Sequence, residues 1–169
     1  GDSDSTVAAT GSVLTQSDSN TKIEATGASS SYVASDVSDI VEAVMPSIVS
    51  ITNVSESQYQ SFFGGTQTQQ STSCGSGIIV SQDADNLYIA TNNHVVEGAD
   101  SLTVAFSDNT TVSAEIKGTD PSTDLAVIRV ALSSIDSDTL NTIKVATLGN
   151  SDDLKAGQAA IAIGNALGY

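Results

Sequence analysis

The sequence predicts a mainly β domain, folded as an antiparallel barrel or sandwich, from two observations. From Cys74 onward, short apolar runs of strand length are separated by turns rich in Asp, Asn and Gly. The run that begins at Ser101 alternates, so that Leu102, Val104 and Phe106 share one face. The chain has 169 residues, which is long enough for one domain with a real hydrophobic core.

Residues 1–34 are rich in Ser, Thr, Ala, Asp and Gly and contain few large apolar side chains. Such a segment buries little surface, so we expect a flexible N-terminal linker or tail. The alternative is that two short runs, 12–15 and 22–26, add edge strands to a sheet. The folded part is expected over residues 35–169.

The first expected element of the folded part is a short helix over 35–45. Val37, Ile40, Val41 and Val44 follow the spacing of one helical face, and Pro46 ends the helix. Next, the β-branched residues 47–54 predict a strand. The polar residues 55–73 predict a long loop, in which Phe62-Phe63 serves either as a partner anchor or as a local core.

The rest of the chain predicts strands joined by turns. The expected strands cover 77–81, 87–91, 101–107, 112–116, 125–130, 145–148 and 158–163. A short helical turn closed by glycine is expected over 94–98, and a polar loop over 132–142.

The composition excludes several classes of partner. Twenty acidic residues against five basic ones give a formal charge of −15, which disfavours nucleic acids and anionic lipid surfaces. Cys74 is the only cysteine, so neither an internal disulfide nor a multi-cysteine metal site can form. The acidic turn 83–86 resembles a calcium loop but lacks the glycine and distant glutamate, so we expect a solvated turn. No metal and no cofactor is predicted.

His94 is the only histidine, and Asp124 follows it thirty positions later. A lone histidine is more often structural than catalytic. An imidazole oriented by a carboxylate, however, is what a serine nucleophile requires as a general base. Asp124 precedes a strand, as a partner of His94 should, whereas its rival Asp120 precedes Pro121 and suits a turn.

Five motifs occur in order along the chain: Gly75-Ser76-Gly77-Ile78-Ile79-Val80, Thr91-Asn92-Asn93-His94-Val95-Val96-Glu97-Gly98-Ala99, Gly118-Thr119-Asp120-Pro121-Ser122-Thr123-Asp124-Leu125-Ala126-Val127, Leu148-Gly149-Asn150-Ser151-Asp152 and Ala162-Ile163-Gly164-Asn165. Their order and spacing resemble the HtrA/Deg family of trypsin-like serine proteases. The resemblance covers about residues 36–169.

The resemblance implies a chymotrypsin-like fold of two antiparallel β-barrels, of which this chain holds the first barrel, the opening strands of the second and a short N-terminal helix. It implies that His94 is the general base and Asp124 its orienting carboxylate. The nucleophile of the family lies in a Gly-Asn-Ser-Gly-Gly motif, which this sequence lacks. Asp152 and Asp153 place negative charge beside Ser151, and Ser76 matches a structural strand, so neither is expected to be the nucleophile.

The missing serine would lie beyond Tyr169, so this chain alone is expected to be inactive. The family also implies hydrolysis of peptide bonds in unfolded proteins or peptides, a role in protein quality control, and a location in the cell envelope or outside the cell. A membrane anchor through a removed N-terminal segment is compatible with this. Further expected partners are the remainder of the protease domain and, by family analogy, the other subunits of a trimer.

A second hypothesis is that the chain is a non-catalytic interaction or structural module that retains the first barrel. In either case, a strand ending near Ile163 would leave an open sheet edge. We therefore expect dimerisation, strand swapping, retention of a separate C-terminal fragment, or coverage of the edge by the N-terminal runs.

Overall fold

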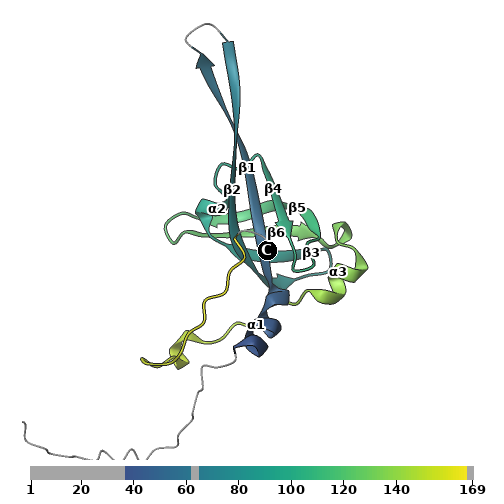
Figure 1. Ribbon diagram of the computed structural model, residues 1–169, viewed down its shortest axis with the longest axis vertical. Helices are drawn as coiled ribbons and strands as arrows, with labels where there is room; N and C mark the ends of the chain where they lie inside the picture. The colour runs from purple at the N-terminus through teal and green to yellow at the C-terminus, as the bar shows by residue number, and fades with distance from the viewer. Residues whose placement is uncertain (1–36, 62–64, 167–169) are drawn as a thin grey trace, which may run out of the picture. The chain divides into compact units, whose positions relative to one another are not determined.

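The computed structural model describes residues 37–61 and 65–166 (Figure 1). The predictions for the N-terminal residues 1–34, including the two short runs, and for Phe62-Phe63 lie outside the described residues. No helix among the described residues is long and apolar enough to cross a membrane.

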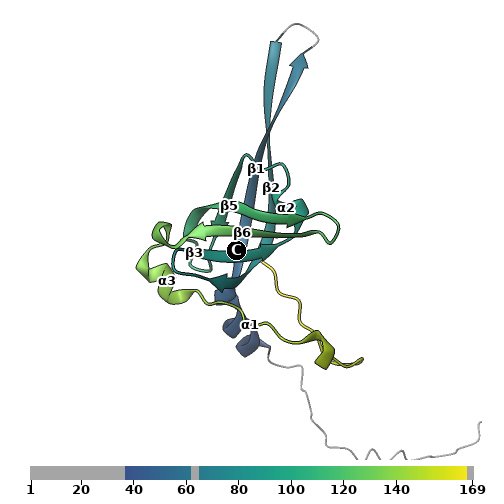
Figure 2. The same cartoon turned by 180° about the vertical axis from the view of Figure 1, so that it is seen from behind.

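Six antiparallel strands form a closed barrel (Figures 1 and 2), which confirms the predicted mainly β fold. The strand order around the barrel is β1-β2-β3-β6-β5-β4. The strands are β1 Ile48–Ser61, β2 Gly65–Gln82, β3 Asn86–Thr91, β4 Ser101–Ala105, β5 Thr111–Asp120 and β6 Leu125–Ala131. Because β4 pairs with both β5 and β1, the sheet closes on itself and its barrel portion has no free edge.

The barrel interior is filled by the apolar residues of the alternating strands. In β3, Leu87 and Ile89 are buried while Tyr88 between them is half-buried. Leu102, Val104 and Phe106 are buried together, as predicted. On the return strand β5 the alternation fades: Val112 is buried, whereas Ile116 is exposed at a register shift that ends at Gly118.

The predicted loop over 55–73 is wrong, because most of it is strand. Beyond the barrel, β1 and β2 continue as a long two-stranded arm, in register from Glu56 opposite Gln70 to Ser61 opposite Gly65 (Figures 1 and 2). A two-stranded ladder satisfies the backbone groups of both strands whatever the side chains are. The polar composition of the arm reflects the exposure of its described side chains, not an absence of secondary structure.

The predicted strands 145–148 and 158–163 are also wrong, so the opening strands of a second barrel are absent from the described residues. Among residues 143–166 the structure has only the 3-10 turn η3, Ser151–Asp153, and irregular backbone. Two backbone hydrogen bonds hold the start of this segment. Lys144 N donates to Pro46 O in η1 at 3.0 Å, and Ala146 N donates to Ile79 O in β2 at 2.8 Å. An isolated strand needs a sheet edge, and the closed barrel offers none here. The open edge expected near Ile163 therefore does not form.

The short helix before β1 is confirmed as α1, Ser38–Val44, and Pro46 lies in the 3-10 turn η1, Met45–Ser47, that follows it. Val37 occupies the N-cap position of α1, without a side-chain capping hydrogen bond. None of the residues of α1 is buried, so its apolar stripe remains accessible in this structure.

The predicted polar loop 132–142 instead contains the 3-10 turn η2, Leu132–Ser134, and the helix α3, Ser137–Thr142. Asp136 caps α3 by accepting a 2.9 Å hydrogen bond from Thr139 N. The buried Thr139 hydroxyl donates to Asp108 Oδ2 at 2.6 Å and lies 2.9 Å from Thr110 Oγ1. This hydrogen bond from Thr139 is the main reason that the pKa of Asp108 lies below its usual value. Thus α3 is fastened to the β4–β5 turn by side-chain hydrogen bonds.

Replacing the Thr139 hydroxyl is therefore expected to destabilise the barrel. Thr139→Val keeps the volume and removes both hydroxyl contacts, which should lower the free energy of unfolding by about 1 kcal/mol. Urea denaturation followed by circular dichroism measures this. Ser137→Ala, at an exposed position of the same helix, is the control, and equal stabilities of the two variants would contradict the assignment.

Candidate active site

The candidate site begins where β3 ends. After Thr91 the chain passes through the extended residue Asn92 into a single helical turn, α2, Asn93–Val96. Val95 and Val96 are buried against the barrel. The His94 side chain, in contrast, points outward and is 68% exposed. The predicted closing glycine is confirmed, since Gly98 has a φ of +67°.

Asp124 contacts His94 at two points. Its Oδ1 accepts a 2.9 Å hydrogen bond from the backbone N–H of His94, and its Oδ2 lies 2.7 Å from Nδ1 of the ring. The backbone carbonyl of Asp124 also accepts hydrogen bonds from Asn93 N at 3.1 Å and from Asn92 Nδ2 at 3.0 Å. Asp124 therefore holds the ring and the backbone of His94 and also the two residues that precede His94 in the chain.

The backbone of Asp124 explains how it reaches α2. Its φ of +54° is unusual for a residue with a side chain, and it lies directly before β6. The neighbouring strands β3 and β6 pair Thr91 with Ala126. The ends of two adjacent strands thus bring residues thirty positions apart into contact.

Asp120, the rival candidate, does not contact His94. Its carboxylate accepts hydrogen bonds from Ser122 Oγ at 2.5 Å and from Thr123 Oγ1 at 2.8 Å, within its own turn. The structure therefore pairs His94 with Asp124 and leaves Asp120 to hold the turn.

The electrostatics of the pair favour an ionised carboxylate. The hydrogen bond from the His94 backbone N–H, followed by that from the ring, lowers the pKa of Asp124 below the ordinary value of 3.8. A carboxylate whose pKa is lower in the folded state stabilises the fold above the ordinary carboxyl range. That contribution is lost as the pH falls through the folded-state pKa.

The Gly75-Ser76-Gly77 motif explains the placement of α2. A Cβ atom on Gly75 would lie 2.5 Å from Val95 Cγ2, and one on Gly77 would lie 2.6 Å from Ile89 Cγ2. Glycine at position 75 is thus what lets α2 approach β2 so closely. The motif therefore has a direct steric role in placing the turn that carries His94.

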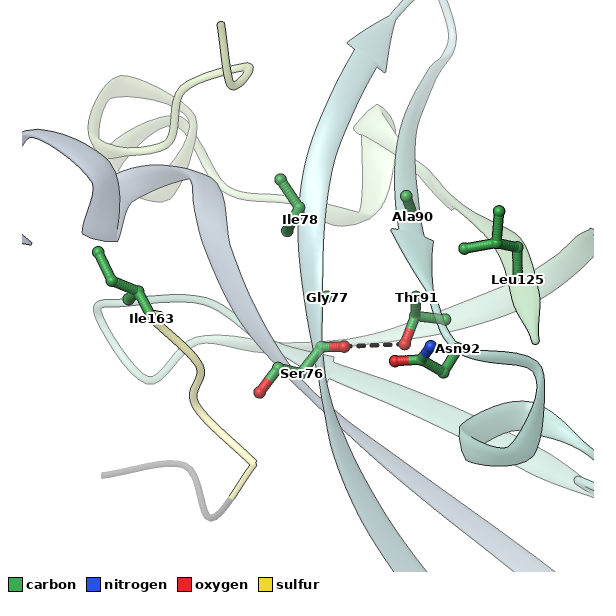
Figure 3. Close-up of a pocket in the computed structure, with 8 residues that line it drawn as sticks. All are labelled: Ser76, Gly77, Ile78, Ala90, Thr91, Asn92, Leu125 and Ile163. Carbon is green, nitrogen blue, oxygen red and sulfur yellow. Dashed lines mark hydrogen bonds between the residues drawn. The ribbon is translucent and has the colours of Figure 1, made fainter. Parts of the chain in front are cut away.

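A cavity of about 290 Å³ is lined in part by Leu125, which follows Asp124 in the chain, and by Asn92, which lies two positions before His94 (Figure 3). Its lining combines apolar side chains with backbone of β2 and β3, and the residues are Ser76, Gly77, Ile78, Ala90, Thr91, Asn92, Leu125 and Ile163. Thr91 Oγ1 donates a 2.8 Å hydrogen bond to the Ser76 carbonyl across this lining (Figure 3). The backbone N–H of Asn165 donates to Ser76 Oγ at 2.6 Å. Ile78 and Leu125 remain exposed there.

No group of three or more His, Cys, Asp or Glu side chains within residues 37–61 and 65–166 is arranged to hold a metal ion. In the acidic turn 83–86, Asp83 Oδ1 accepts from the backbone N–H groups of Asp85 and Asn86, and Oδ2 accepts from the Tyr88 hydroxyl. This carboxylate is engaged in shaping its own turn.

Comparison with known proteins identifies the family. The family model of the trypsin-like peptidase domain matches residues 75–169, more than half of the chain. The chain belongs to the trypsin-like peptidase family. The serine proteases Do-like HtrA and Do-like HtrB of Bacillus subtilis strain 168 are each 42% identical to it, over 139 and 137 residues. A probable periplasmic serine endoprotease, DegP-like, of Halomonas elongata is 46% identical over 101 residues.

A solved structure, the HtrA-type protease AlgW with a decapeptide, superimposes with a TM-score of 0.55 at 28% identity. The superposition covers 70% of this chain and 37% of the AlgW chain. The predicted resemblance to HtrA-type trypsin-like proteases is therefore confirmed. The matches cover 80% of this chain but only 29% and 28% of the two Bacillus proteins, so this trypsin-like peptidase chain spans less than a third of their length.

In this trypsin-like peptidase chain, the contacts of Ser76 and Ser151 among the described residues lie away from the His94 ring. Ser151 begins the turn η3 beside Asp152 and Asp153, and the Ser76 hydroxyl accepts from Asn165 N. That neither serine is the nucleophile stays a prediction. Sequence reasoning missed the roles of Asn92, whose side chain donates to the Asp124 carbonyl, and of Asn53, whose side chain donates to the carbonyls of Val95 and Glu97. A polar residue at the inward-facing position 53, in phase with Val49 and Ile51, was the available signal.

The steric role of Gly75 predicts a large effect from one methyl group. Gly75→Ala should lower the free energy of unfolding by about 1–3 kcal/mol, because Val95 must move. Thermal or chemical denaturation measures the loss. Adding Val95→Ala should relieve the clash and make the double variant's loss smaller than the sum of the two single losses.

Gly118→Ala is the matched control for this prediction, because a Cβ atom there meets nothing within 4 Å. Its stability should stay within about 0.5 kcal/mol of the parent. Equal losses for the two alanine variants would show that Gly75 has no special packing role.

The lowered pKa of Asp124 predicts the acid limit of the His94–Asp124 contact. The chemical shift of the His94 backbone amide should change with a midpoint below pH 3.8, because this N–H binds the titrating carboxylate. An NMR titration of the chain measures it, and Asp124→Asn should abolish the transition. A midpoint at or above 3.8 would contradict the two-point contact.

Proposed function

We propose that this chain provides the general base, His94, and the orienting carboxylate, Asp124, of an HtrA-type serine endopeptidase. The single observation that carries the proposal is the two-point contact, in which Asp124 binds both the ring and the backbone of His94. The family membership and the serine-protease relatives support it.

The geometry suits the chemistry of a serine nucleophile. With Nδ1–H donated to Asp124 Oδ2, the other ring nitrogen, Nε2, is left as the acceptor that takes a proton from a serine hydroxyl. The ionised carboxylate then stabilises the imidazolium that forms. The exposure of the His94 side chain leaves Nε2 accessible to a group from outside the barrel.

The serine and the donors for the oxyanion are proposed to come from residues outside this 169-residue sequence, which contains no Gly-Asn-Ser-Gly-Gly motif. The cavity lined by Ile78 and Leu125 is then part of the surface that meets those residues. The greater length of the Bacillus relatives supports this division.

The proposed substrates are polypeptides, since a structural relative was solved with a decapeptide. An extracytoplasmic location is supported by the DegP-like relatives named as periplasmic. The family resemblance also supports a role in protein quality control and assembly as a trimer.

The proposal predicts that a polypeptide extending this chain through the serine motif hydrolyses peptide bonds, whereas the 169-residue chain does not. In the longer polypeptide, Asp124→Asn should lower kcat by a factor of about 10⁴, because the imidazole loses its tautomer and its counter-charge. Cleavage of a fluorogenic peptide measures kcat.

Asp120→Asn is the matched control, because this carboxylate lies in the same turn and accepts its hydrogen bonds from Ser122 and Thr123. Its kcat should stay within the same order of magnitude as the parent. A longer polypeptide that lacks hydrolysis, or equal losses in the two variants, would overturn the proposal and favour the non-catalytic module.

A further inference from the structure

Asn53 is a buried polar residue on the inward face of β1. Val49, Ile51 and Asn53 alternate along this face, and Asn53 is only 3% exposed. A buried amide among aliphatic side chains costs free energy unless its groups find partners. Its contacts therefore indicate what the residue is for.

The Asn53 amide binds the last turn of α2. Its Nδ2 donates to Val95 O at 3.0 Å and to Glu97 O at 3.1 Å, across more than forty residues of sequence. Carbonyl groups at a helix C-terminus have no partner within the helix. Asn53 supplies that partner from the barrel.

These two contacts also fix the orientation of the amide. A flipped side chain would point Oδ1 at two carbonyl oxygens, which repel it. In the observed orientation Oδ1 is buried and has no hydrogen-bond partner among the described residues. The fold therefore tolerates an unpaired buried acceptor in order to keep both bonds to α2.

We propose that Asn53 is a positioning residue for His94. One helical turn cannot hold its own geometry, because helix nucleation is unfavourable at this length. Asp124 fixes the beginning of α2 through the N–H groups of Asn93 and His94, and Asn53 fixes its end. The direction of the His94 ring, and so its contact with Asp124, depends on both anchors. The inference rests on the proposed function only in taking His94 as the base.

The test reads the His94 ring directly and needs no hydrolysis. His94 is the only histidine, so ¹⁵N-labelled histidine gives the signals of one imidazole. At alkaline pH, where imidazole is neutral, the parent chain should carry its proton on Nδ1, facing Asp124. Asn53→Asp, whose carboxylate repels both carbonyls, and Asn53→Ser, which retains a shorter donor, should lose that preference and show the tautomer mixture of a free imidazole.

Thr139→Val is the matched control, because it removes buried hydrogen bonds at α3, which lies away from α2 (Figures 1 and 2). It should destabilise the barrel while keeping the proton on Nδ1. Folded Asn53 variants that keep the parent tautomer would overturn the inference. Unfolding of both variants would also overturn it, because a positioning role requires the barrel to stay folded without the two Asn53 hydrogen bonds. If the longer polypeptide failed to hydrolyse peptides, this result would be unaffected, so the two proposals fail separately.

Discussion

The structure depends on the contact between the Asp124 carboxylate and α2. Its two oxygens bind the ring and the backbone of one residue, so the carboxylate sets both the direction of the imidazole and the course of the chain that carries it. Barrel closure makes the contact possible, because the end of β3, which leads to His94, lies beside the start of β6, which follows Asp124. A rigid barrel can thus hold an exposed pair in a fixed geometry, which preorganised catalysis needs.

A single helical turn carries His94, and the barrel surrounds that turn with supports. Gly75 gives Val95 room to approach β2, Asn53 binds the carbonyls at the end of the turn, and Asp124 binds its beginning. These residues come from three separate strands or turns. Gly75 leaves space because it has no side chain, whereas Asn53 forms two hydrogen bonds, and both effects help to place the turn that carries His94.

Sequence reasoning succeeded where local pattern and tertiary structure agree. The alternation of Leu102 and Val104 predicted a barrel strand, and the His94 motif with its distance to Asp124 predicted their pairing. It failed where the pairing of strands decides the outcome. The polar residues 55–73 form an arm because β1 and β2 pair with each other, whereas residues 158–163 form no strand because the closed barrel leaves them no sheet edge to pair with. The polar residue at the inward-facing position 53 is visible in the sequence, but its partner is not, because the contact with α2 depends on the approach of two distant segments.

In the proposed function, His94 is the base for a serine that lies outside this sequence. Mapping the site of a fluorophosphonate adduct by mass spectrometry, on a polypeptide that extends this chain, tests that claim most directly. We expect one modified serine, outside the 169 residues, whose labelling is lost in His94→Ala. An adduct on Ser76 or Ser151 would contradict the account.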